Sequence, residues 1–118
     1  MSRVLVAEDE MMLRMIAVES LEDAGFDVLH ASDGEEALKL LKNNPDITLL
    51  VSDVKLPRMD GYALAEAGLT LRPDLKILLM TGYAQDPPAG LTRTRDIQTL
   101  HKPFDLDRLC NLVRDMVG

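Results

Sequence analysis

Short strand-like segments alternate with helical segments along the whole chain, and this alternation is the feature that most constrains the fold. The strand-like segments are rich in Val, Ile, Leu and Thr, residues that are common in strands or buried cores. They lie at about 3–8, 27–31, 47–53, 75–81 and 97–101. Strict β-α alternation predicts an α/β protein with a doubly wound parallel sheet and helices on both of its faces.

Chain length and the handedness of connections favour one arrangement of these strands. The chain has 118 residues, so we expect a single domain over 1–118. Right-handed crossovers favour a five-stranded sheet in the order 2-1-3-4-5, a flavodoxin-like three-layer α/β/α architecture. In that order the first and third strands are neighbours where the winding reverses. The crevice at their carboxyl ends is therefore the expected ligand site.

Apolar spacing predicts which residues of the helices are buried. The first helix, at about 10–24, should bury Leu13, Ile16, Ala17, Leu21 and Ala24. The second begins at a cap at Ser32 or Asp33 and stops near Asn43, and the third spans about 61–71. The last, at about 105–117 with Asp105 as its cap, should bury Leu106, Leu109, Leu112, Val113 and Met116. Four Gly and Pro residues between 82 and 96 predict an irregular segment or a shortened fourth helix.

Composition excludes several classes of function. The formal net charge is −7, which disfavours direct binding to nucleic acid or to an anionic membrane. No apolar run approaches the roughly 20 residues of a membrane-spanning helix. A single cysteine, Cys110, cannot form an intramolecular disulfide, which fits a reducing, cytoplasmic environment. We therefore expect a cytoplasmic protein.

Polar residues follow four of the five predicted strands at the point where each strand ends. Glu8 and Asp9 follow the first strand, Asp53 ends the third, Thr81 ends the fourth and Lys102 follows the fifth. The carboxyl ends of parallel strands meet at one edge of the sheet, so we expect these side chains to lie together. Taken singly, each has an ordinary explanation as a solvated turn, a cap or a surface charge. Their joint occurrence at four strand ends favours a site.

The residue types at this edge indicate chemistry with a divalent cation and a phosphoryl group. Neighbouring carboxylates repel one another, and a cation removes that penalty. Oxygen ligands suit Mg²⁺, while the absence of a His or Cys cluster argues against zinc or copper. Lys102 and Thr81 could hold phosphoryl oxygens, and a carboxylate can act as the nucleophile. Asp53 is the best candidate because it ends the central strand.

At this point the whole chain resembles a response regulator receiver domain of two-component signalling, of the stand-alone type. Four blocks carry the resemblance, and they stand in the family's order: Val6 to Glu10, Ser52 to Gly61, Met80 to Gly82, and Lys102 to Phe104. The spacing from Asp53 through Pro57 to Asp60 and Gly61 is specific on its own.

The resemblance implies a role for each site residue. Asp53 would accept a phosphoryl group from a histidine kinase or a histidine phosphotransfer protein. Asp9, Asp53 and the backbone carbonyl of Lys55 would bind Mg²⁺, with Glu8 contributing through water. Thr81 and Lys102 would bind the phosphoryl oxygens. The protein would catalyse only its own phosphorylation and dephosphorylation, and it would act as a monomer or weak dimer through contacts with an unknown downstream protein.

Two departures and one surface feature affect how the signal would be transmitted. The family usually has an aromatic residue three positions before its lysine, and this chain has Thr99 there. The irregular 82–96 segment lies where the family commonly carries its output face. In the first helix, Met11, Met12 and Met15 fall largely off the predicted buried face, and flexible methionines suit a protein-docking surface.

Two other functional classes stay open at this stage. One is a receiver-like binding module that signals without phosphate, which Thr99 favours. The other is a small Mg²⁺-dependent phosphohydrolase with an aspartyl-phosphate intermediate. Such enzymes generally need a second acid two residues after the nucleophile, and Lys55 occupies that position here.

Overall fold

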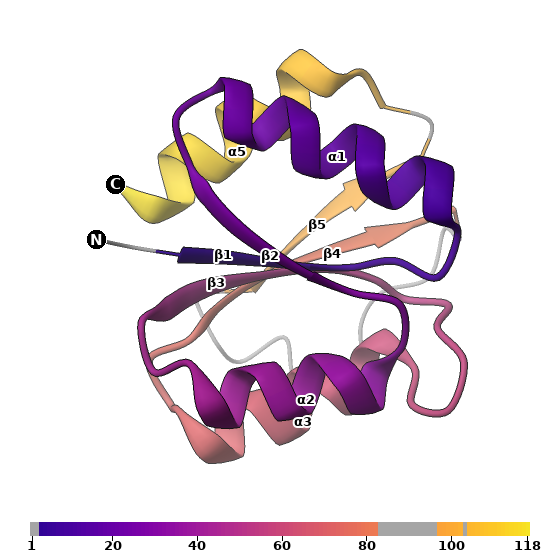
Figure 1. The fold of residues 1–118 in the computed structure, drawn as a ribbon, viewed down its shortest axis with the longest axis vertical. Coiled ribbons are helices and arrows are strands. Elements are labelled where there is room, and N and C mark those ends of the chain that lie inside the picture. Colours follow the sequence, from indigo (N-terminus) through magenta and orange to yellow (C-terminus); the bar gives the residue numbers. More distant parts are fainter. Residues whose placement is uncertain (1–2, 83–96, 103) are drawn as a thin grey trace.

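A computed structural model describes residues 3–82, 97–102 and 104–118 of the chain (Figure 1). The described residues form five strands and four helices. The strands are β1 (Arg3–Ala7), β2 (Asp27–Ala31), β3 (Ile47–Asp53), β4 (Lys76–Thr81) and β5 (Ile97–His101). The helices are α1 (Met11–Asp23), α2 (Gly34–Asn43), α3 (Gly61–Leu71) and α5 (Leu106–Val117). The predicted strands and helices that lie in these ranges are confirmed, and their ends differ from the predicted ends by at most one residue.

The five strands form one parallel sheet in the order β2-β1-β3-β4-β5. This order confirms the predicted doubly wound arrangement. β1 and β3 are neighbours, with Ala7 paired with Ser52, and β3 pairs Asp53 with Met80 of β4. The last pair of β4 and β5 joins Thr81 to His101. The register therefore brings the carboxyl ends of the four strands to one edge.

Helices cover both faces of the sheet, and the alternation of strand side chains separates two cores (Figure 1). In β1, Val4 and Val6 pack in the core beneath α1 and α5. Leu5 and Ala7, which point the opposite way, pack in the core beneath α2 and α3. Every residue of β3 except Thr48 is buried, as expected for the central strand of a covered parallel sheet.

Local signals in the sequence fix where the helices begin and end. Asp33 accepts a hydrogen bond from the amide of Glu36 at the start of α2, and Asp105 accepts one from the amide of Arg108 at the start of α5. Both predicted caps are thereby confirmed. Gly25 follows α1 with φ of 100°, a conformation that glycine adopts without strain.

Three apolar side chains predicted to be buried are exposed instead. Leu13, Ile16 and Leu106 keep 45%, 41% and 40% of their surface exposed. They lie in the first turns of α1 and α5, where the space between the two helices is an open apolar cavity instead of packed core. Ala24 and Leu112 are half-buried. Helical spacing identifies the side on which a residue lies, but not whether another element covers it.

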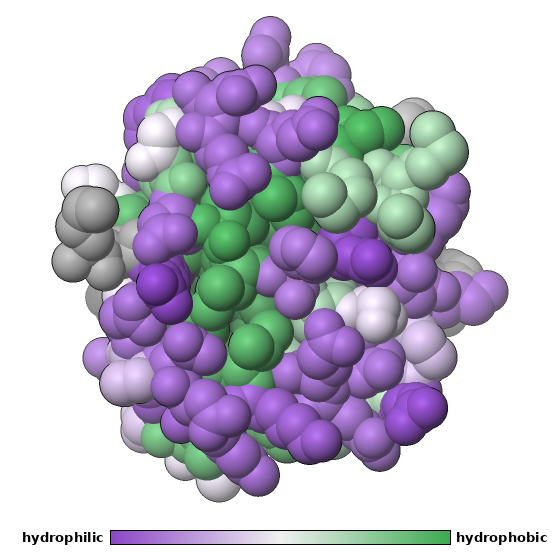
Figure 2. All heavy atoms as spheres, viewed as in Figure 1, coloured by the Kyte–Doolittle hydropathy of each residue, from purple (hydrophilic) through white to green (hydrophobic). Residues whose placement is uncertain are grey.

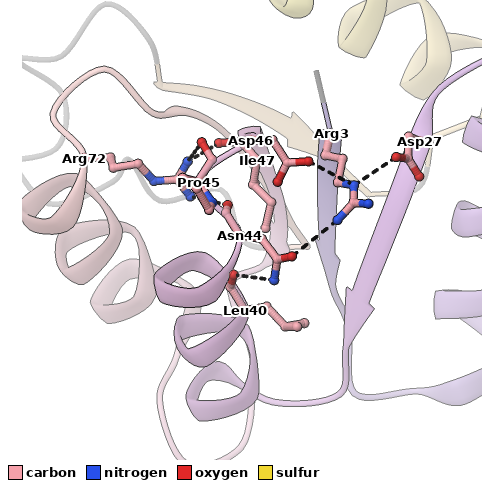
Figure 3. A network of polar contacts seen from close by, with 8 residues as sticks. All are labelled: Arg3, Asp27, Leu40, Asn44, Pro45, Asp46, Ile47 and Arg72. Atoms are coloured by element: carbon pink, nitrogen blue, oxygen red, sulfur yellow. Dashed lines mark hydrogen bonds and ion pairs between the residues drawn. The ribbon is translucent and has the colours of Figure 1, made fainter. Parts of the chain in front are cut away.

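Two arginines make the polar contacts at the opposite end of the sheet, where the first and third strands begin (Figure 3). Arg72, just after α3, donates hydrogen bonds to backbone carbonyls at the end of α2, in the α2–β3 connection and in β3 itself. Arg3, at the start of β1, forms ion pairs with Asp27 and Asp46. These contacts tie α3, the α2–β3 connection and the first two strands together at the edge away from the site.

The irregular or shortened fourth helix predicted for 82–96 falls on residues 83–96, which lie outside the described residues. Among the helices that the structure describes, none is long and apolar enough to cross a membrane.

Candidate functional site

Three carboxylates from two strand ends converge at the predicted edge. Glu8 and Asp9 follow β1, and Asp53 ends β3. One oxygen of each lies within 4.8 Å of the others. Glu8 and Asp53 are buried, whereas Asp9 is exposed to solvent. The structure therefore confirms that the acidic residues meet, and it leaves one side of the cluster open.

The electrostatics of this cluster favour a bound cation. Burial, a hydrogen bond with Asp9 and the charge of Asp53 raise the pKa of Glu8 to about 7. The nearby Lys102 ammonium and the amide of Glu10 oppose this rise without cancelling it. The cluster is thus short of positive charge, and a divalent cation with a preference for oxygen ligands would supply it. The donor set fits Mg²⁺.

Lys102 lies beside two of the carboxylates. Its Nζ donates a hydrogen bond to Oδ2 of Asp53 at 2.6 Å and lies 3.8 Å from Oε1 of Glu8. Burial lowers the pKa of the ammonium, but the hydrogen bond to Asp53 and the charges of the acidic residues outweigh this, so the net shift is upward. Lys102 is therefore a stable cation at the site and is already in contact with Asp53.

Thr81 is buried at the end of β4, on the Lys102 side of Asp53. Its carbonyl accepts a hydrogen bond from the Lys102 amide at 2.8 Å. Its predecessor, Met80, is paired with Asp53 across β3 and β4. The fold thus places the predicted hydroxyl residue on the strand next to Asp53, with its carbonyl hydrogen-bonded to the backbone amide of Lys102.

The loop after β3 holds Asp53 from its other side. The Lys55 amide donates a hydrogen bond to Oδ1 of Asp53 at 3.1 Å. Gly61, the first residue of α3, donates its amide to the Val54 carbonyl, and a Cβ there would lie 2.4 Å from the Asp53 carbonyl oxygen. Only glycine allows this approach, so Gly61 fixes the loop against the end of β3. The predicted role of the Lys55 carbonyl as a metal ligand stays a prediction.

Among the residues that the structure describes, sequence reasoning missed Arg14 at this site. Its Nη1 donates a hydrogen bond to the backbone carbonyl of Glu8 at 3.0 Å. Arg14 lies in the first turns of α1, six positions after Glu8. The available signal was a basic residue one helical turn beyond an acidic cluster, which is weak without coordinates.

An apolar cavity of about 520 Å³ opens next to the acidic cluster, between α1 and α5. It is lined by Glu8, Leu13, Ile16, Ala17, Met80, Lys102, Phe104, Leu106 and Leu109. Beside it, Met11, Met12 and Met15 of α1 are exposed, as predicted from helical spacing. Figure 2 shows a hydrophobic patch on the surface over the beginning of α1.

Comparison with known sequences identifies the relatives of this chain. The family described as the response regulator receiver domain matches residues 4–114. The response regulator receiver protein CpdR of Brucella abortus is 38% identical over 120 residues, covering 99% of this chain and 98% of that protein. The sensor kinase CckA of the same organism is 36% identical over 97% of this chain, but the match spans only 12% of CckA.

Solved structures have the same architecture. The receiver domain of the hybrid histidine kinase CckA superposes with a TM-score of 0.85 at 31% identity, covering 99% of this chain and all of that domain. The Vibrio cholerae chemotaxis protein CheY4 gives a TM-score of 0.86 at 27% identity, covering 98% of both chains. A receiver domain from Clostridium thermocellum gives a TM-score of 0.88 at 24% identity, a likeness of fold.

Proposed function

The chain belongs to the response regulator receiver domain family of two-component signalling, and on that premise we propose that it is a switch activated by phosphorylation of Asp53. One observation carries the proposal. Asp53, at the end of the central strand, contacts both the ammonium of Lys102 and an acidic pair that is short of positive charge. We further propose that residues 1–118 act as one receiver domain.

Each polar group at the site has a distinct part in this proposal. Asp9 and Asp53, with the Lys55 carbonyl, would hold Mg²⁺, and Glu8 would contribute through water. When bound, the cation would neutralise the carboxylates and the oxygens of an incoming phosphoryl group. The Lys55 amide holds Oδ1 of Asp53 and so fixes the orientation of the carboxylate.

Phosphoryl transfer would then proceed on Asp53 itself. A carboxylate oxygen attacks the phosphorus of a phosphohistidine on the partner, the new O–P bond forms, and the N–P bond breaks with its electron pair returning to the imidazole. Lys102 moves from the Asp53 carboxylate to a phosphoryl oxygen, and the Thr81 hydroxyl donates to another. Water later hydrolyses the acyl phosphate. The chain thus catalyses only its own phosphorylation and dephosphorylation, and hydrolysis releases the phosphoryl group as inorganic phosphate.

The phosphodonor in this proposal is a sensor histidine kinase or a histidine phosphotransfer protein. A receiver-like segment within the sensor kinase CckA is consistent with such a partnership. The exposed methionines of α1 closely follow the exposed Asp9 in the sequence, so we expect a helical partner that packs on them to bring its histidine close to Asp53. Output would come from contacts with a further protein, and we expect a monomer or weak dimer.

Incubation with acetyl phosphate and Mg²⁺, followed by intact-mass analysis, tests this function. The wild type should gain one phosphoryl group, and Asp53→Asn should gain none. Asp46→Asn removes another aspartate carboxylate at the opposite edge of the sheet and is the matched control, so it should still gain the group. If the wild type stays unmodified under conditions in which it is folded, a binding module that signals without phosphate becomes the better explanation, as Thr99 would favour.

A further inference from the structure

We propose that Arg14 is a positioning residue for the acidic cluster, acting through the backbone of Glu8. This inference rests on the proposed function, because it concerns how the Mg²⁺ ligands are held. Among the hydrogen bonds and ion pairs of the described residues, none joins Arg14 to Asp53. The effect of Arg14 would be on the geometry of the turn between β1 and α1, which carries Glu8 and Asp9.

The hydrogen bond from Arg14 fixes the peptide unit that carries both acids. The carbonyl that accepts from Nη1 belongs to the planar peptide joining Glu8 to Asp9. Holding its oxygen therefore sets the rotation of that plane, and with it the directions in which the two side chains leave the backbone. On the other side of Glu8, its amide donates to the Ala31 carbonyl of β2 at 3.1 Å. Glu8 is thus held by its amide and by its carbonyl.

Arg14 is itself anchored by the helix that follows the cluster. Its backbone amide donates to the Glu10 carbonyl at 2.9 Å, which closes the first turn of α1. The Glu10 amide in turn lies 3.4 Å from Oε2 of Glu8. The turn, the start of α1 and the guanidinium therefore form one hydrogen-bonded unit, and a helix is a rigid base for positioning a ligand set.

The buried Nε of the half-buried Arg14 argues that this contact has a purpose beyond stability. Its Nε is buried and has no hydrogen-bond partner among the described residues. An unpartnered buried donor lowers stability, so a side chain chosen for stability alone would not place it there. A guanidinium near the acids would also compete electrostatically with a bound cation. The contact is therefore better explained by the geometry that it imposes on the Glu8 carbonyl.

The sign of one measurement separates positioning from charge. If Arg14 acts through its charge alone, Arg14→Ala should tighten Mg²⁺ binding, because a nearby positive charge is removed. If it positions the ligands, Arg14→Ala should weaken Mg²⁺ binding by about tenfold, as the loss of outer-shell partners does at other metal sites. Arg14→Lys keeps the charge but not the planar fork, so it should also weaken binding.

Magnesium affinity should be measured on the folded, unphosphorylated chain by a nitrogen–proton NMR titration. Arg108→Ala removes an arginine from the exposed first turn of α5 and is the matched control, with an expected affinity equal to that of the wild type. Circular dichroism establishes that each variant is folded at the titration temperature. Unchanged or tighter binding in folded Arg14→Ala would overturn the inference while leaving the proposed function intact.

A second measurement uses the wild type and needs no variant. The Nε–H of Arg14 should give a resolved, slowly exchanging NMR signal because it is buried, and this signal should shift as Mg²⁺ is added. The Nε–H of Arg108 should not shift. A wild type that takes up Mg²⁺ without moving the Arg14 signal would contradict the inference. A wild type that takes up no Mg²⁺ at all would overturn both this inference and the proposed function.

Discussion

The ammonium nitrogen of Lys102 lies 2.6 Å from Oδ2 of Asp53, so the proposed phosphoryl acceptor is already paired with a cation. The other Asp53 oxygen accepts from the Lys55 amide. Both oxygens therefore have a donor before any cation or phosphoryl group arrives. Under the proposed function, Mg²⁺ and then the phosphoryl group must take over part of the interaction that Lys102 now makes. We therefore expect the contact between Lys102 and Asp53 to change first when Mg²⁺ or a phosphoryl group binds.

Lys102→Gln should have opposite effects on stability and on Mg²⁺ affinity. Without Mg²⁺, loss of the ammonium leaves Asp53 and Glu8 without the cation that pairs with both of them, and the free energy of unfolding should fall by about 1–3 kcal/mol. Mg²⁺ binding should become tighter, because the metal no longer competes with the lysine. Urea unfolding with and without Mg²⁺ measures both effects. Lys39→Gln, on the exposed side of α2, is the control, and weaker Mg²⁺ binding in Lys102→Gln would contradict this explanation.

Stability without Mg²⁺ should depend on pH through Glu8. Its pKa in the folded protein is raised to about 7, mainly by burial, so the folded state holds a proton that the unfolded state has released. The resulting stabilisation is complete below the unfolded pKa of about 4.5 and is lost as the pH rises through about 7. The loss in the free energy of unfolding should be at most about 3 kcal/mol.

Urea unfolding at about pH 5 and about pH 8 checks this dependence. Glu8→Gln cannot ionise, so its free energy of unfolding should fall less between these two pH values. Saturating Mg²⁺ should likewise reduce the fall in the wild type. Glu19→Gln, an exposed glutamate on α1, should behave like the wild type. Equal pH dependence in wild type and Glu8→Gln would show that another group titrates.

Thr81→Ala should separate phosphoryl uptake from the response to it. The hydroxyl is expected to bind a phosphoryl oxygen only after transfer, so uptake from acetyl phosphate should persist, with a rate reduced by less than about tenfold. The structural response should be smaller, because the oxygen loses a buried donor at the end of β4. Intact mass measures uptake, and amide NMR shifts measure the response. Thr81→Ser keeps the hydroxyl and should restore the structural response. A full response in Thr81→Ala would show that the hydroxyl does not transmit the presence of the phosphoryl group.

The sequence predicted the fold and the meeting of the site residues because both depend on local and repeating signals. Alternating segments, caps such as Asp33 and Asp105, and the polar ends of the strands are visible in a single chain. Parallel strands then bring Asp53 and Lys102 to one edge whatever the details of packing. No comparable local signal shows how the protein would contact its downstream partner. Neither the segment 83–96 nor Thr99, which stands where the family usually has an aromatic residue, predicts that contact.

What the sequence could not give is the packing between elements that are distant along the chain. Leu13 and Leu106 have the spacing of buried residues, yet both are exposed because α1 and α5 leave an open cavity between their first turns. The hydrogen bond from Arg14 to the Glu8 carbonyl depends on the conformation of the Arg14 side chain and on the geometry of the turn between β1 and α1. Neither follows from periodicity, which specifies a direction but not a neighbour.

The same limit applies to Arg72, whose function in the fold is evident only in three dimensions (Figure 3). Its guanidinium donates to the carbonyls of Leu41, Asn44, Pro45 and Ile47. These carbonyls lie at the end of α2, in the following turn and at the start of β3, and the Asn44 carbonyl also accepts from the Ile47 amide. Replacing the guanidinium removes a donor from several partly buried acceptors at once.

Arg72→Ala should therefore lower the free energy of unfolding by about 2–4 kcal/mol, measured by urea denaturation. Arg72→Lys should recover less than half of this loss, because one ammonium cannot span carbonyls that the planar fork reaches together. Arg114→Ala, at an exposed position of α5, should change stability by less than about 0.5 kcal/mol. Mg²⁺ affinity should be unchanged in folded Arg72→Ala, because the network lies at the edge of the sheet opposite the acidic cluster. A loss of stability no larger than that of Arg114→Ala would mean that water replaces the guanidinium at these carbonyls without cost.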